Sequence, residues 1–189
     1  MTATARQHFT PLQRLLHWSM AVAILAMLFI GVGMVSTIAP KYLTLVSIHK
    51  PLGIAILALA LVRLIVRFTR GAPGLPRDLP EPMKLAAHLS HYALYALMIG
   101  MPLVGWAMVS AGGYPVTIGG SLRLPALVGQ SDSLQATLRT LHVFGAFAFF
   151  ALILTHLAAA LFHALVRRDG VFEAMAGGTP PAREVAPAE

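Results

Sequence analysis

Residues 141–165 read LHVFGAFAFFALILTHLAAALFHAL, an apolar stretch without aspartate, glutamate, lysine or arginine. A helix needs about 20 such residues to cross a hydrocarbon layer of roughly 30 Å. Lipid offers no hydrogen-bond partner to the backbone, so a segment inside it must be helical to satisfy its own N–H and C=O groups. This stretch therefore predicts a transmembrane helix. The histidines within it are costly there and mark candidate functional positions.

Three further apolar stretches are long enough to cross the same layer. The fold class that we expect is an all-α integral membrane four-helix bundle. The first helix should be retained, because its apolar run is longer than that of a cleavable signal peptide. The four predicted helices cover about residues 15–36, 46–68, 87–109 and 141–165.

The composition supports a membrane protein and excludes other classes. Of the 189 residues, 57% are apolar and only 11% are charged, and the mean hydropathy is +0.74. Soluble domains carry about 25% charged residues, so an ordinary soluble enzyme is excluded. The net charge of +7 does not indicate a nucleic-acid partner, because the basic residues lie between apolar runs rather than along one polar face. The lipid bilayer is the expected partner.

The connections differ in character and set the domain organisation. Residues 70–82 contain four prolines, which should end one helix and delay the next until Met83. The loop between Ala111 and Asp132 is rich in glycine, proline and serine. We expect one transmembrane domain over residues 15–168, flanked by a cytoplasmic N-terminus (1–14) and a cytoplasmic tail (169–189). The tail should be disordered after residue 177.

Lysine and arginine counts near the helix ends predict the orientation, because cytoplasmic loops carry an excess of them. Ten fall on the side that carries both termini, and four fall on the other side. We therefore expect a bacterial inner-membrane protein with both termini in the cytoplasm. The four outer residues are Lys41, Lys50, Arg123 and Arg139; the ten inner ones are Arg6, Arg14, Arg63, Arg67, Arg70, Arg77, Lys84, Arg167, Arg168 and Arg183.

Four histidines pair by depth in the predicted bundle. His142 and His156 are fourteen residues apart, which returns a helix to nearly the same face about 21 Å further along. His49 should lie opposite His142 on the outer side, and His17 opposite His156 on the inner side. Two bis-histidine sites stacked across the membrane are the geometry of a di-haem electron-transfer protein. The absence of cysteine excludes thiolate ligands and the covalent attachment of a c-type haem.

Other interpretations of these residues remain open. A single intramembrane histidine can simply bind a carbonyl on a neighbouring helix. A bare zinc or copper site is a further alternative, although it favours three or four converging ligands, and no carboxylate lies within the four spans. Gly53 and Gly145 can give a flat cofactor room or can serve helix packing. Phe149, midway between His142 and His156, can separate two rings or can pack as a core residue.

Five short motifs occur together in this chain: RLLHW (14–18), HKPLG (49–53) followed by Arg63, AHLSHYALY (87–95), LH (141–142) and TH (155–156). By these motifs the chain resembles the bacterial cytochrome b561 family over residues 6–175. The resemblance implies that His17, His49, His142 and His156 are axial ligands of two non-covalent b haems. It also implies electron exchange with ubiquinone and similarity to a superoxide oxidase, which passes an electron from periplasmic superoxide to the quinone pool.

Further residues are candidates for the two ends of this electron transfer. On the inner side, His163 lies two turns beyond His156 and matches a histidine that the family associates with quinone binding. His88, His91 and Lys84 can complete that pocket, and His91 is also a rival ligand for the inner haem. Candidates for steering an anion or for pairing with haem propionates are Lys50, Arg139 and, on the inner side, Arg63.

Superoxide:ubiquinone oxidoreductase activity is the leading functional hypothesis, and no obligate protein partner is evident. One alternative is a membrane-anchor cytochrome b subunit that connects a partner dehydrogenase or hydrogenase to the quinone pool. Another is a haem or metal transporter with histidine relays, which the lack of carboxylates in the spans does not favour.

Overall fold

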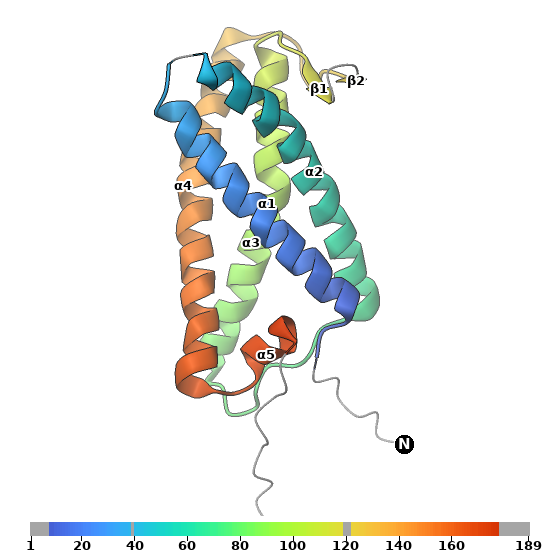
Figure 1. Ribbon diagram of the computed structural model, residues 1–189, viewed down its shortest axis with the longest axis vertical. Coiled ribbons are helices and arrows are strands. Elements are labelled where there is room, and N and C mark those ends of the chain that lie inside the picture. Colours follow the sequence, from blue (N-terminus) through green and yellow to red (C-terminus); the bar gives the residue numbers. More distant parts are fainter. Residues whose placement is uncertain (1–7, 39, 119–121, 178–189) are drawn as a thin grey trace, which may run out of the picture.

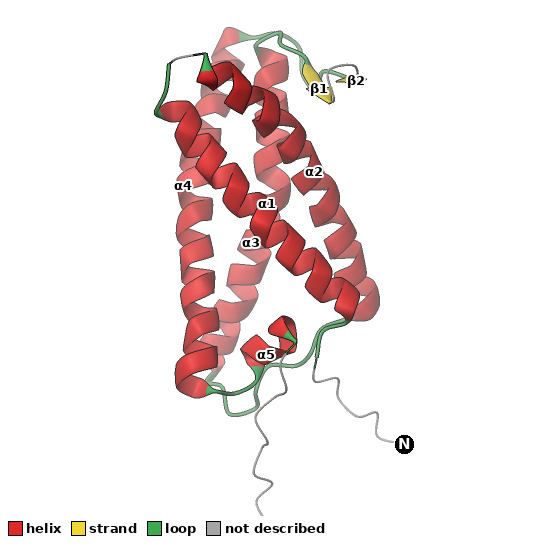
Figure 2. Ribbon diagram, in the orientation of Figure 1, coloured by secondary structure: helices red, strands yellow, loops and turns green. Residues whose placement is uncertain are grey.

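The computed structural model describes residues 8–38, 40–118 and 122–177, and four long helices dominate it (Figures 1 and 2). The helices form one bundle, with a small hairpin at one end and a short helix at the other. In chain order the elements are α1 (Pro11–Val35), α2 (Lys41–Arg70), α3 (Glu81–Ala111), β1 (Val116–Ile118), β2 (Leu122–Leu124), α4 (Asp132–Phe162), a π-helical turn η1 (His163–Arg167) and α5 (Val171–Ala176).

The four long helices have the length and the apolar character needed to cross a membrane. Their most apolar windows have mean hydropathies between 1.7 and 2.3. Large apolar side chains lie exposed along them, such as Phe29 on α1 and Phe68 on α2, which are 77% and 79% exposed. Such a surface is stable against lipid and unfavourable against water. The expected all-α membrane bundle is confirmed.

Each of the four long helices begins before its predicted apolar span, and polar side chains cap the starts of α1 and α4. α1 begins at Pro11, where Thr10 and Gln13 form a capping box. α4 begins at Asp132, nine residues before the predicted span, because the Ser131 hydroxyl accepts a hydrogen bond from the Leu134 backbone. α3 begins at Glu81 rather than at Met83, since proline is tolerated in the first turn of a helix.

Two short elements were not anticipated from the sequence. The connection between α3 and α4 contains an antiparallel hairpin, in which β1 pairs with β2 and Thr117 lies opposite Arg123. At the other end of the bundle, α5 lies within the segment predicted as a tail (Figure 1). It is joined to the start of the chain by a backbone hydrogen bond from Phe9 to Ala174. The disorder predicted after residue 177 falls outside the described residues.

The helices pack in sequence order, α1 on α2, α2 on α3 and α3 on α4. A cluster of buried side chains fills the middle of the bundle and includes Phe149, which is 7% exposed. Phe149 is therefore a packed core residue in this structure. The other buried members of the cluster are Met20, Ile24, Ile56, Ala60 and Met98.

Candidate functional site

The first histidine pair lies toward the hairpin end of the bundle. His49, in the third turn of α2, and His142, in the third turn of α4, have ring centroids 6.1 Å apart with an angle of 67° between the ring planes. Both side chains are half-buried. Two imidazoles from different helices are thus held face to edge within the bundle.

The second pair lies toward the α5 end and includes a third ring. His17 on α1 and His156 on α4 have ring centroids 6.3 Å apart. His91 on α3 lies 5.5 Å from His156, at an interplanar angle of 74°. His91 is exposed, whereas His17 and His156 are half-buried. The structure therefore places the rival ligand beside the pair that the depth argument predicted.

The two predicted pairs have the ring spacing that a shared metal ion requires. A bond from a metal to an imidazole nitrogen is about 2 Å long and the nitrogen lies roughly 1 Å from the ring centre, so two imidazoles on one metal have centres roughly 6 Å apart. Three of the four rings also carry an unsatisfied atom. In the described chain, the Nδ1 atoms of His17, His49 and His142 are buried without a hydrogen-bond partner, which is costly unless something else satisfies the ring.

Each pair joins helices that do not pack closely on one another. The close contacts in the described chain connect consecutive helices, whereas the histidine pairs connect α1 with α4 and α2 with α4. A bis-histidine haem needs this separation, because the macrocycle must lie between the two imidazoles. Among the described residues, no group of three or more potential ligands is placed to hold a metal ion. The donor set therefore fits a b-type haem better than a bare zinc or copper ion.

Three glycines shape the neighbourhood of the hairpin-end pair. A Cβ atom at Gly105 on α3 would lie 3.1 Å from Cε1 of His142. A Cβ atom at Gly145 would lie 2.6 Å from the sulfur of Met101, whereas one at Gly53 would make only an ordinary contact, 3.7 Å from the terminal methyl of Met27. Gly145 thus permits the close packing of α4 on α3, and Gly105 gives the His142 ring its place. The sequence did not indicate Gly105, because no local pattern reveals which side chain of another helix approaches it.

A half-buried cation lies within the half of the bundle that holds the second pair. Arg63 on α2 donates a hydrogen bond from Nε to the Tyr95 hydroxyl on α3, at 3.2 Å. The guanidinium carbon also lies 5.8 Å from the centre of the Tyr95 ring. Tyr95 therefore fixes the direction of Arg63, a candidate partner for an acidic group of a cofactor.

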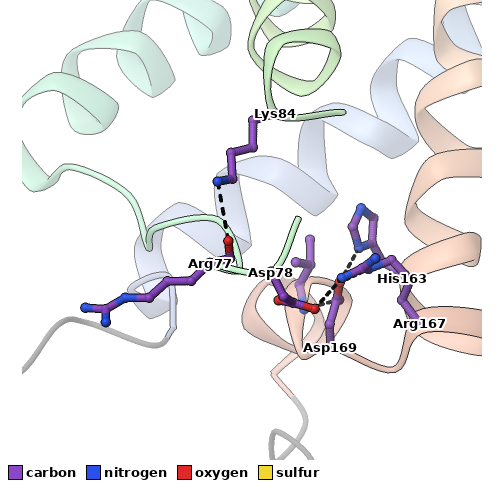
Figure 3. A network of polar contacts seen from close by, with 7 residues as sticks. Arg77, Asp78, Lys84, His163, Arg167 and Asp169 are labelled. Atoms are coloured by element: carbon purple, nitrogen blue, oxygen red, sulfur yellow. Dashed lines mark hydrogen bonds and ion pairs between the residues drawn. The ribbon is translucent and has the colours of Figure 1, made fainter. Parts of the chain in front are cut away.

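The α5 end carries a network of charged side chains that includes His163 (Figure 3). Nδ1 of His163 lies 2.8 Å from Oδ2 of Asp169, and Arg167 donates from Nε to the same oxygen at 2.9 Å. Arg167 also binds Asp78, in the connection between α2 and α3, at 2.6 Å. Burial by itself would raise the pKa of Asp169, but hydrogen bonds from His163, Arg167 and the Val171 backbone lower that pKa overall.

The remaining candidates for the quinone pocket, Lys84 and His88, lie on α3 and make other contacts or lie exposed. Lys84 pairs with Glu81 at 2.8 Å and donates to the backbone oxygen of Arg77 (Figure 3). His88 lies exposed on α3, one turn before His91. Asp169 and Asp78 were not singled out from the sequence, because their positions depend on how the connections fold.

Basic side chains also lie around the hairpin end. Lys50 donates from Nζ to the Pro115 backbone oxygen at 3.4 Å, which holds it beside the hairpin, and Arg139 lies exposed on α4. A pocket of about 300 Å³ between the end of α3 and the hairpin is lined in part by Tyr114, Arg123 and Gln130. Lys50, which follows His49 in the chain, and Arg123 therefore place positive charge at the hairpin end.

Four apolar helices that carry interhelical histidine pairs near both ends define a polytopic membrane protein with sites suited to histidine-ligated haem. Comparison with known proteins assigns the family. Residues 8–178 match the model of prokaryotic cytochrome b561, and the chain belongs to this family. Membership implies a b-type haem and a role in membrane electron transfer.

Three curated relatives show how far the similarity extends. "Cytochrome b561 homolog 2" of Escherichia coli K12 is 28% identical over 164 residues, which cover 85% of this chain and 87% of that protein. "Cytochrome b561 homolog 1" of the same organism is 26% identical over 169 residues, with coverages of 85% and 92%. "Probable superoxide oxidase CybB" of Yersinia pestis is 32% identical over 123 residues, with coverages of 65% and 69%.

Proposed function

We propose that this protein holds two b haems and transfers electrons from superoxide, on the hairpin side of the membrane, to ubiquinone on the α5 side. The observation that carries the proposal is the presence of two histidine pairs, with ring centroids 6.1 Å and 6.3 Å apart, near opposite ends of α4. Haem ligated by two imidazoles supplies a one-electron carrier with no open coordination position for oxygen.

His49 and His142 are the proposed ligands on the hairpin side, and His17 and His156 are those on the α5 side. The protein has to hold each of these rings in a fixed orientation, because misplacing a ligand by about 1 Å weakens a binding site. Gly105 leaves room for the ring of His142. Arg63, directed by Tyr95, provides a positive charge for an acidic group of the cofactor on the α5 side.

The hairpin side has the charge that an anionic donor requires. Lys50 and Arg139 are next to or near the proposed ligands His49 and His142 in the chain, and Arg123 lines the pocket beside them. A local excess of positive charge concentrates small anions and increases their rate of encounter. The relative named as a probable superoxide oxidase supports superoxide as the donor.

The α5 side is the proposed site of quinone reduction, with His163, His88, His91 and Lys84 as candidate binding residues. We propose that this side faces the cytoplasm of a bacterium and that the membrane is the inner one. The excess of lysine and arginine on this side supports the orientation. A quinone reaches such a site from the lipid, whereas protons reach it from the cytoplasm.

Rapid mixing of the oxidised protein with superoxide, in the absence of quinone, tests the donor. The haem should be reduced at a rate near the diffusion limit, roughly 10⁸ M⁻¹s⁻¹ or more, and the rate should fall as salt increases. Lys50→Gln should lower that rate several-fold. Arg77→Gln, which removes a charge at the opposite end, is the matched control and should leave it unchanged. Slow reduction that is independent of salt would contradict superoxide as the donor.

A further inference from the structure

The contact between His163 and Asp169 has the features of a built site rather than a chance surface pair. The two side chains are only 13% and 9% exposed, and the Nδ1 and Oδ2 atoms lie 2.8 Å apart. Oδ2 also accepts from Arg167, while Oδ1 accepts from the Val171 backbone N–H at 3.3 Å. Both oxygens of the Asp169 carboxylate are therefore occupied, which fixes the carboxylate in one orientation.

The backbone between the two residues is folded to bring them together. The π-helical turn η1 ends at Arg167 and is followed by Arg168, a non-glycine residue with a φ of 50°. Gly170, two residues further on, has a φ of 80°. The Arg168 N–H closes this turn on the His163 oxygen at 2.7 Å. A non-glycine residue in the left-handed region is uncommon and costs free energy, so the surrounding contacts must hold it there.

The charge of Asp169 determines which ring nitrogen of His163 carries a proton. The lowered pKa of Asp169 keeps its carboxylate ionised near neutral pH, and an ionised carboxylate can only accept hydrogen bonds. The hydrogen between the two groups must therefore be on Nδ1 of His163. Nε2 is left free to hold a second proton and to lose it, as in other dyads in which a carboxylate orients an imidazole.

We infer that Asp169 is the positioning residue of a proton-delivering His163 at the quinone site, an inference that rests on the proposed function. Ubiquinone takes up two electrons, one from each of two superoxide ions that become dioxygen, and two protons, to form ubiquinol. His163 gives a proton from Nε2 to a quinone oxygen and regains one from water on the same side. Asp169 keeps the Nδ1 hydrogen bond throughout and stabilises the positive ring between transfers.

Arg167 and Asp78 support this arrangement from outside it. Arg167 binds both Asp169 and Asp78, so it connects the dyad to the α2–α3 connection (Figure 3). Asp78 binds Arg167 rather than His163, and its side chain is 72% exposed. Replacing Asp78 removes a carboxylate from the same network but leaves the dyad intact, which makes it the matched control.

The test follows single turnovers of purified, haem-loaded protein that is reduced anaerobically with one equivalent of dithionite, which leaves no excess reductant, and is then mixed with varied ubiquinone-1. Here kcat is the limiting rate of haem oxidation by the quinone, and KM is the ubiquinone-1 concentration that gives half of that rate. Asp169→Asn should lower kcat for quinol formation by about tenfold or more, because a neutral amide cannot stabilise the charged ring. KM for ubiquinone-1, the haem spectrum and the melting temperature should stay close to those of the unmodified protein. Asp169→Glu, which restores the charge, should recover part of kcat, and Asp78→Asn should stay within about twofold.

A solvent deuterium isotope effect separates proton delivery from a structural role. The effect on kcat should be larger in Asp169→Asn than in the unmodified protein, because proton transfer becomes rate-limiting. Unchanged kcat in Asp169→Asn would overturn the inference while leaving the proposed function in place. Equal losses of kcat and melting temperature in Asp169→Asn and Asp78→Asn would overturn it in favour of a structural network. Failure of the unmodified protein to reduce ubiquinone-1 would overturn the proposed function and this inference with it.

Discussion

The buried nitrogen atoms of the paired histidines bear directly on whether this protein binds haem at both pairs. In the described chain, three of the four proposed ligands have a buried Nδ1 atom with no hydrogen-bond partner, and the missing interaction falls on residues that pair between distant helices. A buried polar atom without a partner costs about 1–3 kcal/mol. Coordination to a metal would give one nitrogen of each ring a partner in place of a hydrogen bond. This energetic argument supports haem at both pairs.

Single substitutions should remove the two haems separately. His49→Ala or His142→Ala should abolish the haem signal of the hairpin side, because a haem with one remaining imidazole is no longer six-coordinate. His17→Ala or His156→Ala should abolish the other signal. Low-temperature spectra and the haem content of each purified variant provide the measurement.

Two control variants sharpen that experiment. His8→Ala, outside the helices, should retain both haem signals. His91→Ala should also retain both, although its ring lies 5.5 Å from His156. Loss of the α5-side signal in His91→Ala, with retention in His17→Ala, would reassign the ligand and contradict the proposed pairing.

The elements show which features a sequence can predict and which it cannot. The four helices followed from hydropathy, and the closeness of His49 to His142 followed from depth along helices of known rise. The start of α4 at Asp132 did not follow from hydropathy, because a helix can extend beyond the lipid as far as the residue that caps it. The position of Asp169 depends on positive φ values at the residues on either side of it, Arg168 and Gly170, and only the glycine is a signal for such a value in the sequence.

Helix α3 allows a direct test of the space around His142. Gly105→Ala should disturb the His142 ring, because the added methyl would lie 3.1 Å from its Cε1 atom. Gly100→Ala, on the same helix, meets nothing within 4 Å and is the matched control. Gly105→Ala should therefore weaken or shift only the hairpin-side haem signal, whereas Gly100→Ala should leave both signals unchanged. Identical spectra for the two variants would show that His142 does not depend on Gly105.

The connection between η1 and α5 should open in acid. The pKa of Asp169 is below its ordinary value of 3.8 in the folded protein, so its contribution to stability is complete above about pH 4 and is lost as pH falls through the folded value. His163, Arg167 and the Val171 N–H are the groups that would lose their partner. Exchange of the backbone amide hydrogens of α5 should therefore accelerate at low pH. The measurement uses an Asp78→Asn background, which removes the other carboxylate that binds Arg167.

The control for this measurement is the same variant with Asp169→Asn added. An amide does not titrate, so exchange in α5 should already be faster at neutral pH and should show no further step in acid beyond the intrinsic trend. A step of equal size in both proteins would mean that another group controls the acid transition.

At the scale of the whole molecule, charge is distributed between the two ends of an apolar bundle. The 14 lysines and arginines divide, by the predicted topology, into a larger group of ten on the side of both termini and a smaller group of four on the other side. The larger group predicts a cytoplasmic α5 end. The smaller group is available to an anionic electron donor on the hairpin side. Both groups therefore agree with electron transfer from the hairpin side to the α5 side.

Reporter fusions test the orientation. Green fluorescent protein fused after the last residue should fluoresce, because that end should lie in the cytoplasm, and alkaline phosphatase at the same place should be inactive. Alkaline phosphatase inserted in the α3–α4 connection should be active. The reverse pattern would place the proposed quinone site on the outer side and would contradict the proposed direction.

The ratio of haem to protein in the purified, full-length chain tests the central claim most directly. Pyridine haemochrome absorbance gives the haem, amino-acid analysis gives the protein, and a redox titration counts the separate one-electron transitions. Two histidine pairs with ring centroids 6.1 Å and 6.3 Å apart predict a ratio near two and two transitions of b type. A ratio near one with a single transition, or protein that folds without haem, would contradict the account.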